Sequence, residues 1–107
     1  MRLERHAAVV DEDLPGIYAF IAKDNPDAAE RVLDAVEATF AQLIAQPECG
    51  VLYPTRSARL KGLRILPVHG FNQYLVFYRA QGDTVRVLHV VHGARHLPRL
   101  FRRERRE

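Results

Sequence analysis

The sequence has very little cysteine and no long apolar run, and these two absences narrow the class of protein. Cys49 is the only cysteine among 107 residues, which excludes an internal disulfide and a zinc site built from cysteines. No stretch of about 18 consecutive apolar residues occurs, and the first residues do not form the apolar core of a signal peptide. We therefore expect a cytoplasmic protein that has no contact with a membrane.

Metal-binding patterns are equally scarce. The five histidines are scattered along the chain without the spacing of metal ligands. His89 and His92 lie three residues apart on a predicted strand, so their side chains should point to opposite faces. We expect neither a metal ion nor another cofactor.

The length and composition bound the domain organisation. A chain of 107 residues with 48% apolar residues is suited to one core and is short for two. Neither an internal repeat nor a low-complexity linker divides it. We expect a single domain over residues 1–107.

Acidic residues are scarce in the second half of the chain. Residues 51–107 carry twelve Lys or Arg against three Asp or Glu, whereas residues 1–50 carry four against ten. The formal net charge of +3 hides this division. If the folded protein keeps the two halves on different faces, one face will attract a polyanion or an acidic peptide.

Hydrophobic periodicity predicts one strand and two helices in the first half. Residues 2–10 are predicted to form a strand, and Asp11 or Asp13 is the expected cap of the helix that follows. Apolar residues at helical spacing predict about three helical turns over residues 14–22, and Asn25-Pro26 begins a second helix that ends before Pro47. The apolar stripe of this second helix is Ala29, Val32, Leu33, Val36, Phe40, Leu43 and Ile44.

Three further strands are predicted over residues 63–68, 74–79 and 85–91. Pro67 indicates a sheet edge or a bulge, and the turn at residues 81–83 joins the last two strands into a hairpin. A short C-terminal helix is expected after Leu97. The predicted fold is α+β, with a two-helix hairpin packed on a mostly antiparallel four-stranded sheet in the order strand, helix, helix, strand, strand, strand.

Five segments in the right order carry a resemblance to a known family. They are Asp24-Asn25-Pro26-x-Ala28-Ala29-x-Arg31, Pro47-x-x-Gly50, Leu60-Lys61-Gly62-Leu63-Arg64-x-x-x-Val68, Tyr74-x-Val76-Phe77-Tyr78-Arg79 and Val87-Leu88-His89-Val90-Val91-His92-Gly93-Ala94-Arg95. Together they cover nearly the whole chain and resemble the ParE toxins of the RelE/ParE superfamily.

The resemblance implies a bacterial toxin of a type II toxin–antitoxin system, of the kind associated with plasmid stabilisation. Such a toxin is neutralised in a hetero-oligomer by a small ParD-like antitoxin encoded beside it. ParE-like members act on DNA gyrase and trap it on cleaved DNA, whereas RelE-like members cut messenger RNA on the ribosome. A homologue without activity, which only binds its antitoxin or regulates DNA, is a third alternative.

The chemistry of RNA cleavage favours the gyrase inhibitor. Attack by a 2′-hydroxyl needs a base, an acid and cations around the phosphate. If this chain were an endoribonuclease, the candidate catalytic residues would be His92, Arg64, Lys61 and Arg79. The C-terminal region has no Tyr after Tyr78 and no Glu between Glu48 and Glu104, so the set of acids and bases is incomplete. We expect a protein-binding inhibitor and keep the ribosome-dependent endoribonuclease as the alternative.

The binding residues are predicted from surplus apolar surface and from positive charge. The first helix has more apolar surface than packing on the second requires, and an antitoxin is expected to cover it. The predicted antitoxin-binding residues are Leu14, Ile17, Tyr18, Phe20 and Ile21, with Arg59, Arg64 and Arg79 pairing with acidic groups. The predicted target-binding residues are Arg95, Arg99, Arg102 and Arg103, although this segment is equally compatible with a solvated helix end.

Overall fold

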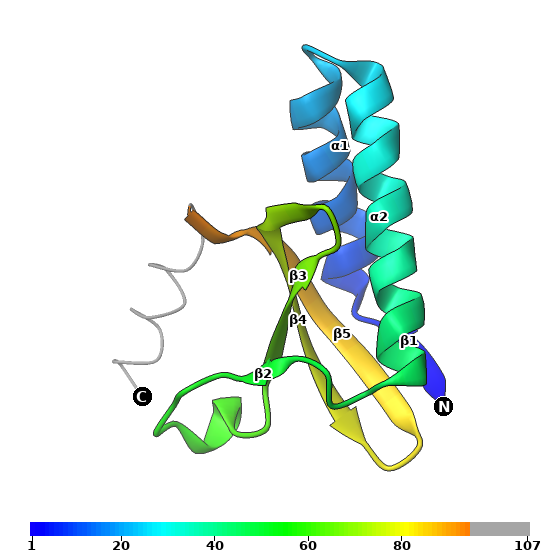
Figure 1. The fold of residues 1–107 in the computed structure, drawn as a ribbon. Coiled ribbons are helices and arrows are strands. Elements are labelled where there is room, and N and C mark those ends of the chain that lie inside the picture. The colour runs from blue at the N-terminus through cyan, green and yellow to red at the C-terminus, as the bar shows by residue number, and fades with distance from the viewer. Residues whose placement is uncertain (95–107) are drawn as a thin grey trace.

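A computed structural model describes residues 1–94 of the chain, and residues 95–107 lie outside the described part. Two helices lie on one face of a five-stranded sheet (Figure 1). The elements in chain order are β1 (Arg2–Arg5), η1 (Val9–Asp13), α1 (Leu14–Ala22), α2 (Pro26–Ala45), β2 (Val51–Leu52), η2 (Ala58–Leu60), β3 (Arg64–Val68), β4 (Phe71–Gln81) and β5 (Thr84–His92).

The two predicted helices are present. The Asn25 side chain caps α2 by accepting a hydrogen bond of 3.1 Å from the backbone N–H of Ala28, and Pro26 occupies the first helical position. The stripe of α2 that faces the sheet is fully buried and includes Val32, Val36, Phe40 and Leu43. Burial of this stripe holds α2 on the sheet.

The strand predicted over residues 2–10 is wrong beyond Arg5. The ladder between β1 and β5 closes where the His6 N–H donates to the Val87 carbonyl at 2.9 Å, and the chain then turns into η1, a π-helical turn. This turn places Val9 in the core with none of its side chain exposed. Helical geometry prevails here because it buries Val9 beside the sheet, which a longer edge strand would not do.

The sheet has the order β1-β5-β4-β3-β2, one strand more than predicted. Strand β1 is parallel to β5, while the other neighbouring pairs are antiparallel. The extra strand, β2, pairs only two residues with β3. The register shifts between Pro67 and Val68, which confirms the predicted bulge.

The main core lies between the helices and the sheet. It includes Val36 and Phe40 of α2 and Val76, Tyr78 and Val87 of the sheet. A smaller cluster of Tyr53, Leu63 and Phe77 lies on the opposite face, hereafter the outer face, where the segment between β2 and β3 covers part of the sheet.

Two further predictions concern a membrane-spanning helix and the C-terminal helix. Within residues 1–94, no helix is long and apolar enough to cross a membrane. The predicted C-terminal helix after Leu97 lies outside the described residues.

Candidate functional site

Helix α1 presents an apolar surface that is only partly buried within residues 1–94. None of its residues is fully buried, and Phe20 is 54% exposed. Leu14, Ile17 and Ile21 are half-buried against the main core. Figure 1 shows that the α1–α2 hairpin extends beyond the sheet, so the outer part of α1 is supported mainly by α2. A partly exposed apolar helix surface of this kind suits contact with an apolar peptide.

The structure separates the predicted antitoxin-binding residues into different surfaces. The five apolar residues lie together on α1. Arg64 pairs in register with Tyr78, a residue of the main core, and therefore faces the helices. Arg79 lies on the outer face, where its Nη2 donates to the Arg59 carbonyl. Arg64 is therefore on the same side of the sheet as the apolar residues of α1, whereas Arg79 and the Arg59 carbonyl that it contacts are on the outer side.

Arg64 holds the loop that follows α2. Its Nη1 donates to the carbonyls of Gly50 at 2.8 Å and Glu48 at 3.2 Å. In the same loop, the Gly50 N–H donates to the Tyr78 hydroxyl at 2.8 Å. Burial raises the pKa of the Tyr78 phenol above its ordinary value of 10.0. These bonds give Arg64 a structural role that its position in the sequence did not indicate.

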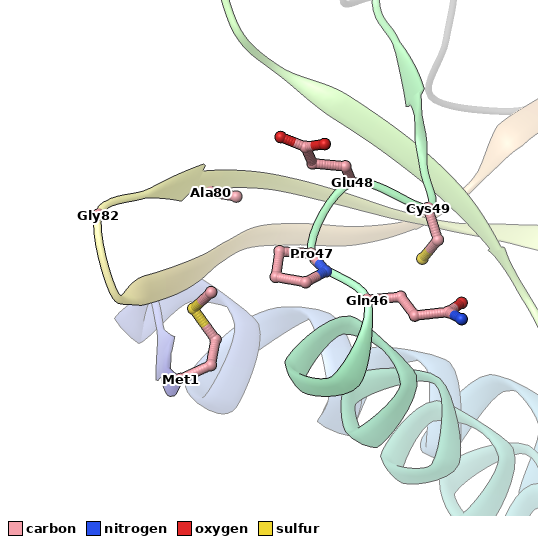
Figure 2. A pocket seen from close by; sticks show the side chains of 7 residues that line it. All are labelled: Met1, Gln46, Pro47, Glu48, Cys49, Ala80 and Gly82. Carbon is pink, nitrogen blue, oxygen red and sulfur yellow. The ribbon is translucent and has the colours of Figure 1, made fainter.

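The loop after α2 also borders a hollow of about 500 Å³. Figure 2 shows that its lining comes from the start of the chain, this loop and the hairpin between β4 and β5. The lining residues are Met1, Gln46, Pro47, Glu48, Cys49, Ala80 and Gly82. One thiol and one carboxylate in a wide hollow do not form an acid and base set, so this hollow gives no indication of catalysis.

Positive charge gathers on the outer face at the end where β4 turns into β5. Arg79 and Arg86 lie directly opposite each other on neighbouring strands. Glu4 on β1 accepts bonds from Arg86 at 3.0 Å and from Arg2 at 3.0 Å. The bond from Arg86 is the main reason that the pKa of Glu4 lies below its ordinary value. Lys61 is exposed at the end of η2.

The residues proposed for a nuclease are not brought together. His92 pairs in register with Tyr74 and contacts its ring edge-on, with 5.4 Å between ring centroids. Tyr74 belongs to the main core, so His92 lies on the helix side. Arg79 lies five residues beyond Tyr74 on β4, which is roughly 16 Å along the strand, and it faces the outer side. An imidazole and a guanidinium in these places cannot act on one phosphate.

Asp13 has a role that the sequence did not reveal. The sequence predicted it as a helix cap, but its side chain makes no capping bond. Instead, its Oδ2 accepts from the Val90 N–H at 3.0 Å and lies 3.2 Å from Nδ1 of His89. It ties the helical segment to β5 where the pairing of β1 with β5 has ended.

Two further site predictions concern metals and the C-terminal segment. Within residues 1–94, no three His, Cys, Asp or Glu side chains are grouped to hold a metal ion. Arg95, Arg99, Arg102 and Arg103, the predicted target-binding residues, lie outside the described part of the chain.

A helical hairpin on one face of a mixed sheet is a two-layer α+β architecture. Residues 7–97 match the family model described as "ParE toxin of type II toxin-antitoxin system, parDE". The chain therefore belongs to the ParE toxin family of type II toxin–antitoxin systems.

A solved structure agrees with this fold. The chain is similar to one described as the chromosomal ParDE TA system from P. aeruginosa, with a TM-score of 0.67 and 18% sequence identity. The similarity covers 86% of this chain and 95% of that chain. A comparison with curated proteins gave no match.

Proposed function

We propose that this toxin inhibits DNA gyrase by binding to it, without a chemical step of its own. The observation that supports the proposal is the separation of His92, on the helix side, from Arg79, on the outer face, while Arg64 is bonded to the carbonyls of Glu48 and Gly50. Membership of the ParE family supports the same conclusion. The toxin acts in the cytoplasm, where gyrase and DNA are found.

We further propose that a cognate ParD-like antitoxin neutralises the toxin by covering α1 in a hetero-oligomer. The support is the apolar surface of that helix, on which Phe20 is 54% exposed. An antitoxin segment that folds as it binds would place apolar side chains on this surface. The similar P. aeruginosa structure is described as a ParDE system, in which toxin and antitoxin form a pair.

The deciding experiment tests both targets with the same purified toxin. Gyrase with supercoiled DNA and ATP should accumulate cleaved DNA complexes when the toxin is added, and the antitoxin should abolish the effect. In a parallel reaction, translating ribosomes should keep their messenger RNA intact. Cuts in the messenger that the toxin produces and that His92→Ala abolishes would contradict the proposal and support the endoribonuclease.

A further inference from the structure

Two arginines occupy directly opposite positions on neighbouring strands of the outer face. Arg79 of β4 and Arg86 of β5 are direct partners in the antiparallel register. Their neighbours Tyr78, Ala80, Val85 and Val87 pack in the main core, so both arginines point away from the helices. Like charges directly opposite each other destabilise a strand pair. A cost of this kind in a natural sequence indicates a functional site.

Within residues 1–94, Glu4 is the one carboxylate that forms an ion pair with these arginines, and Asp83 lies in the turn beside Thr84. Glu4 binds Arg86 at 3.0 Å, but it is shared with Arg2 on the same strand, at 3.0 Å. Arg79 donates to a neutral acceptor, the Arg59 carbonyl. The three arginines Arg2, Arg79 and Arg86, which we name the outer arginine row, therefore share one carboxylate and keep an excess of positive charge.

The hairpin end of the sheet carries further polar residues beside the outer arginine row. Strand alternation places Gln81 beside Arg79, and Thr84 beside Arg86, on the outer face. None of these residues is buried. On the outer face, Leu75 and Val91 lie toward the opposite end of β4 and β5, whereas Leu88 is two residues from Arg86.

This distribution of charge and polarity distinguishes between two kinds of anionic partner. A peptide that folds on binding is anchored by apolar side chains in pockets, which this end of the sheet does not offer. A nucleic acid backbone is a row of phosphates that is bound by arginines and by polar side chains such as Thr and Gln. Guanidinium groups also suit phosphate because they can donate two parallel bonds.

We propose that the outer arginine row binds the phosphate backbone of duplex DNA, without reading its sequence. The choice of DNA over RNA rests on the proposed function, since gyrase acts on DNA. In the complex, Arg79 and Arg86 contact phosphates of the backbone, and Arg2 contacts it further along. The toxin thus holds DNA directly while its partner enzyme is bound.

The test measures DNA binding by the full-length toxin in the absence of gyrase. The probe is a short fluorescein-labelled DNA duplex, and fluorescence anisotropy gives the dissociation constant between about 50 and 200 mM salt. We expect Arg79→Gln/Arg86→Gln to weaken binding at least about tenfold and to lower the slope of log K against log salt by about 1.8. The control, Lys23→Gln/Arg31→Gln, removes the same charge from exposed positions on the helix side and should bind as the wild type does.

Several results would overturn the proposal. These are absence of DNA binding by the wild-type toxin, equal weakening by the two double variants, and tighter binding to an RNA duplex of the same sequence. A loss of antitoxin affinity in Arg79→Gln/Arg86→Gln with unchanged DNA affinity would assign the row to the antitoxin instead. Thermal unfolding reports on folding, and removal of the like-charge pair should leave the melting temperature unchanged or higher.

The test of DNA binding and the test of gyrase inhibition can succeed or fail independently. A toxin that binds the duplex through Arg79 and Arg86 but leaves gyrase active would contradict gyrase inhibition and leave the DNA site standing. A toxin that traps gyrase equally well with and without the two arginines, and shows no binding to DNA alone, would do the reverse.

Discussion

Arg5 and Glu37 form a two-point ion pair that joins β1 to α2. Nη1 of Arg5 lies 2.8 Å from Oε2 of Glu37, and Nη2 lies 2.6 Å from Oε1. The guanidinium also lies over the ring of Phe40, with 4.9 Å between Cζ and the ring centroid. Because β1 is a short edge strand of four residues, this contact fixes its position against the helix layer.

Replacing Arg5 by Gln should lower the free energy of unfolding by about 1 kcal/mol, because two parallel charged hydrogen bonds and a cation–π contact are lost. The measurement is urea denaturation followed by circular dichroism. Arg2→Gln is the control, since that side chain is 70% exposed and its loss should change stability by less than about 0.5 kcal/mol. Equal losses in the two variants would show that the two-point geometry contributes nothing.

Removing the Tyr78 hydroxyl should destabilise the protein more strongly. In Tyr78→Phe the Gly50 N–H loses its partner in a buried place, which costs about 1–3 kcal/mol. Tyr18→Phe serves as the control, because Tyr18 is only half-buried on α1. Urea denaturation gives the free energy of unfolding of both variants. A Tyr78→Phe protein as stable as the wild type would refute the role of this bond.

The same phenol predicts a loss of stability in alkaline solution. Burial raises the pKa of Tyr78 above 10.0, so the folded protein keeps a proton that the unfolded chain releases. Unfolding then becomes more favourable as the pH rises above about 10. The free energy of unfolding, measured between about pH 8 and pH 11, should fall more steeply for the wild type than for Tyr78→Phe. Parallel curves for the two proteins would contradict this assignment.

The parts of the fold that sequence analysis predicted are those with local signals. Helix α2 has a cap at Asn25 and a continuous apolar stripe, and the hairpin of β4 and β5 has strand residues on both sides of a turn at Gly82. The end of β1 and the existence of β2 depend on partners distant in the sequence. Pairing of this kind has no local signature, so the analysis predicted one strand that was too long and missed another.

The same contrast between local signals and partners distant in the sequence applies to the site residues. The opposition of Arg79 and Arg86 can be derived from the tight turn between Gln81 and Thr84, because hairpin register follows from loop length. The role of Arg64 could not be derived, since nothing local indicates that its guanidinium meets the carbonyls of Glu48 and Gly50.

The apolar surface of α1 gives the most direct test of antitoxin recognition. Phe20 is 54% exposed on a helix with no fully buried residue, so replacing it by Glu should leave folding intact. In the complex the new carboxylate would lie in an apolar contact without a partner, which costs several kcal/mol when the charge is buried. We expect affinity for the antitoxin to fall at least about hundredfold, equivalent to about 2.7 kcal/mol.

The control for this variant is Val51→Glu, which introduces the same charge at an apolar residue that is 74% exposed on β2. Isothermal titration with the cognate antitoxin should give the wild-type affinity for Val51→Glu and a weakened one for Phe20→Glu. Thermal unfolding of both free variants checks that the fold is retained. If Phe20→Glu folds and binds as tightly as the wild type, the antitoxin occupies another surface. Weakening by Val51→Glu alone would direct the search to the edge of the sheet at β2.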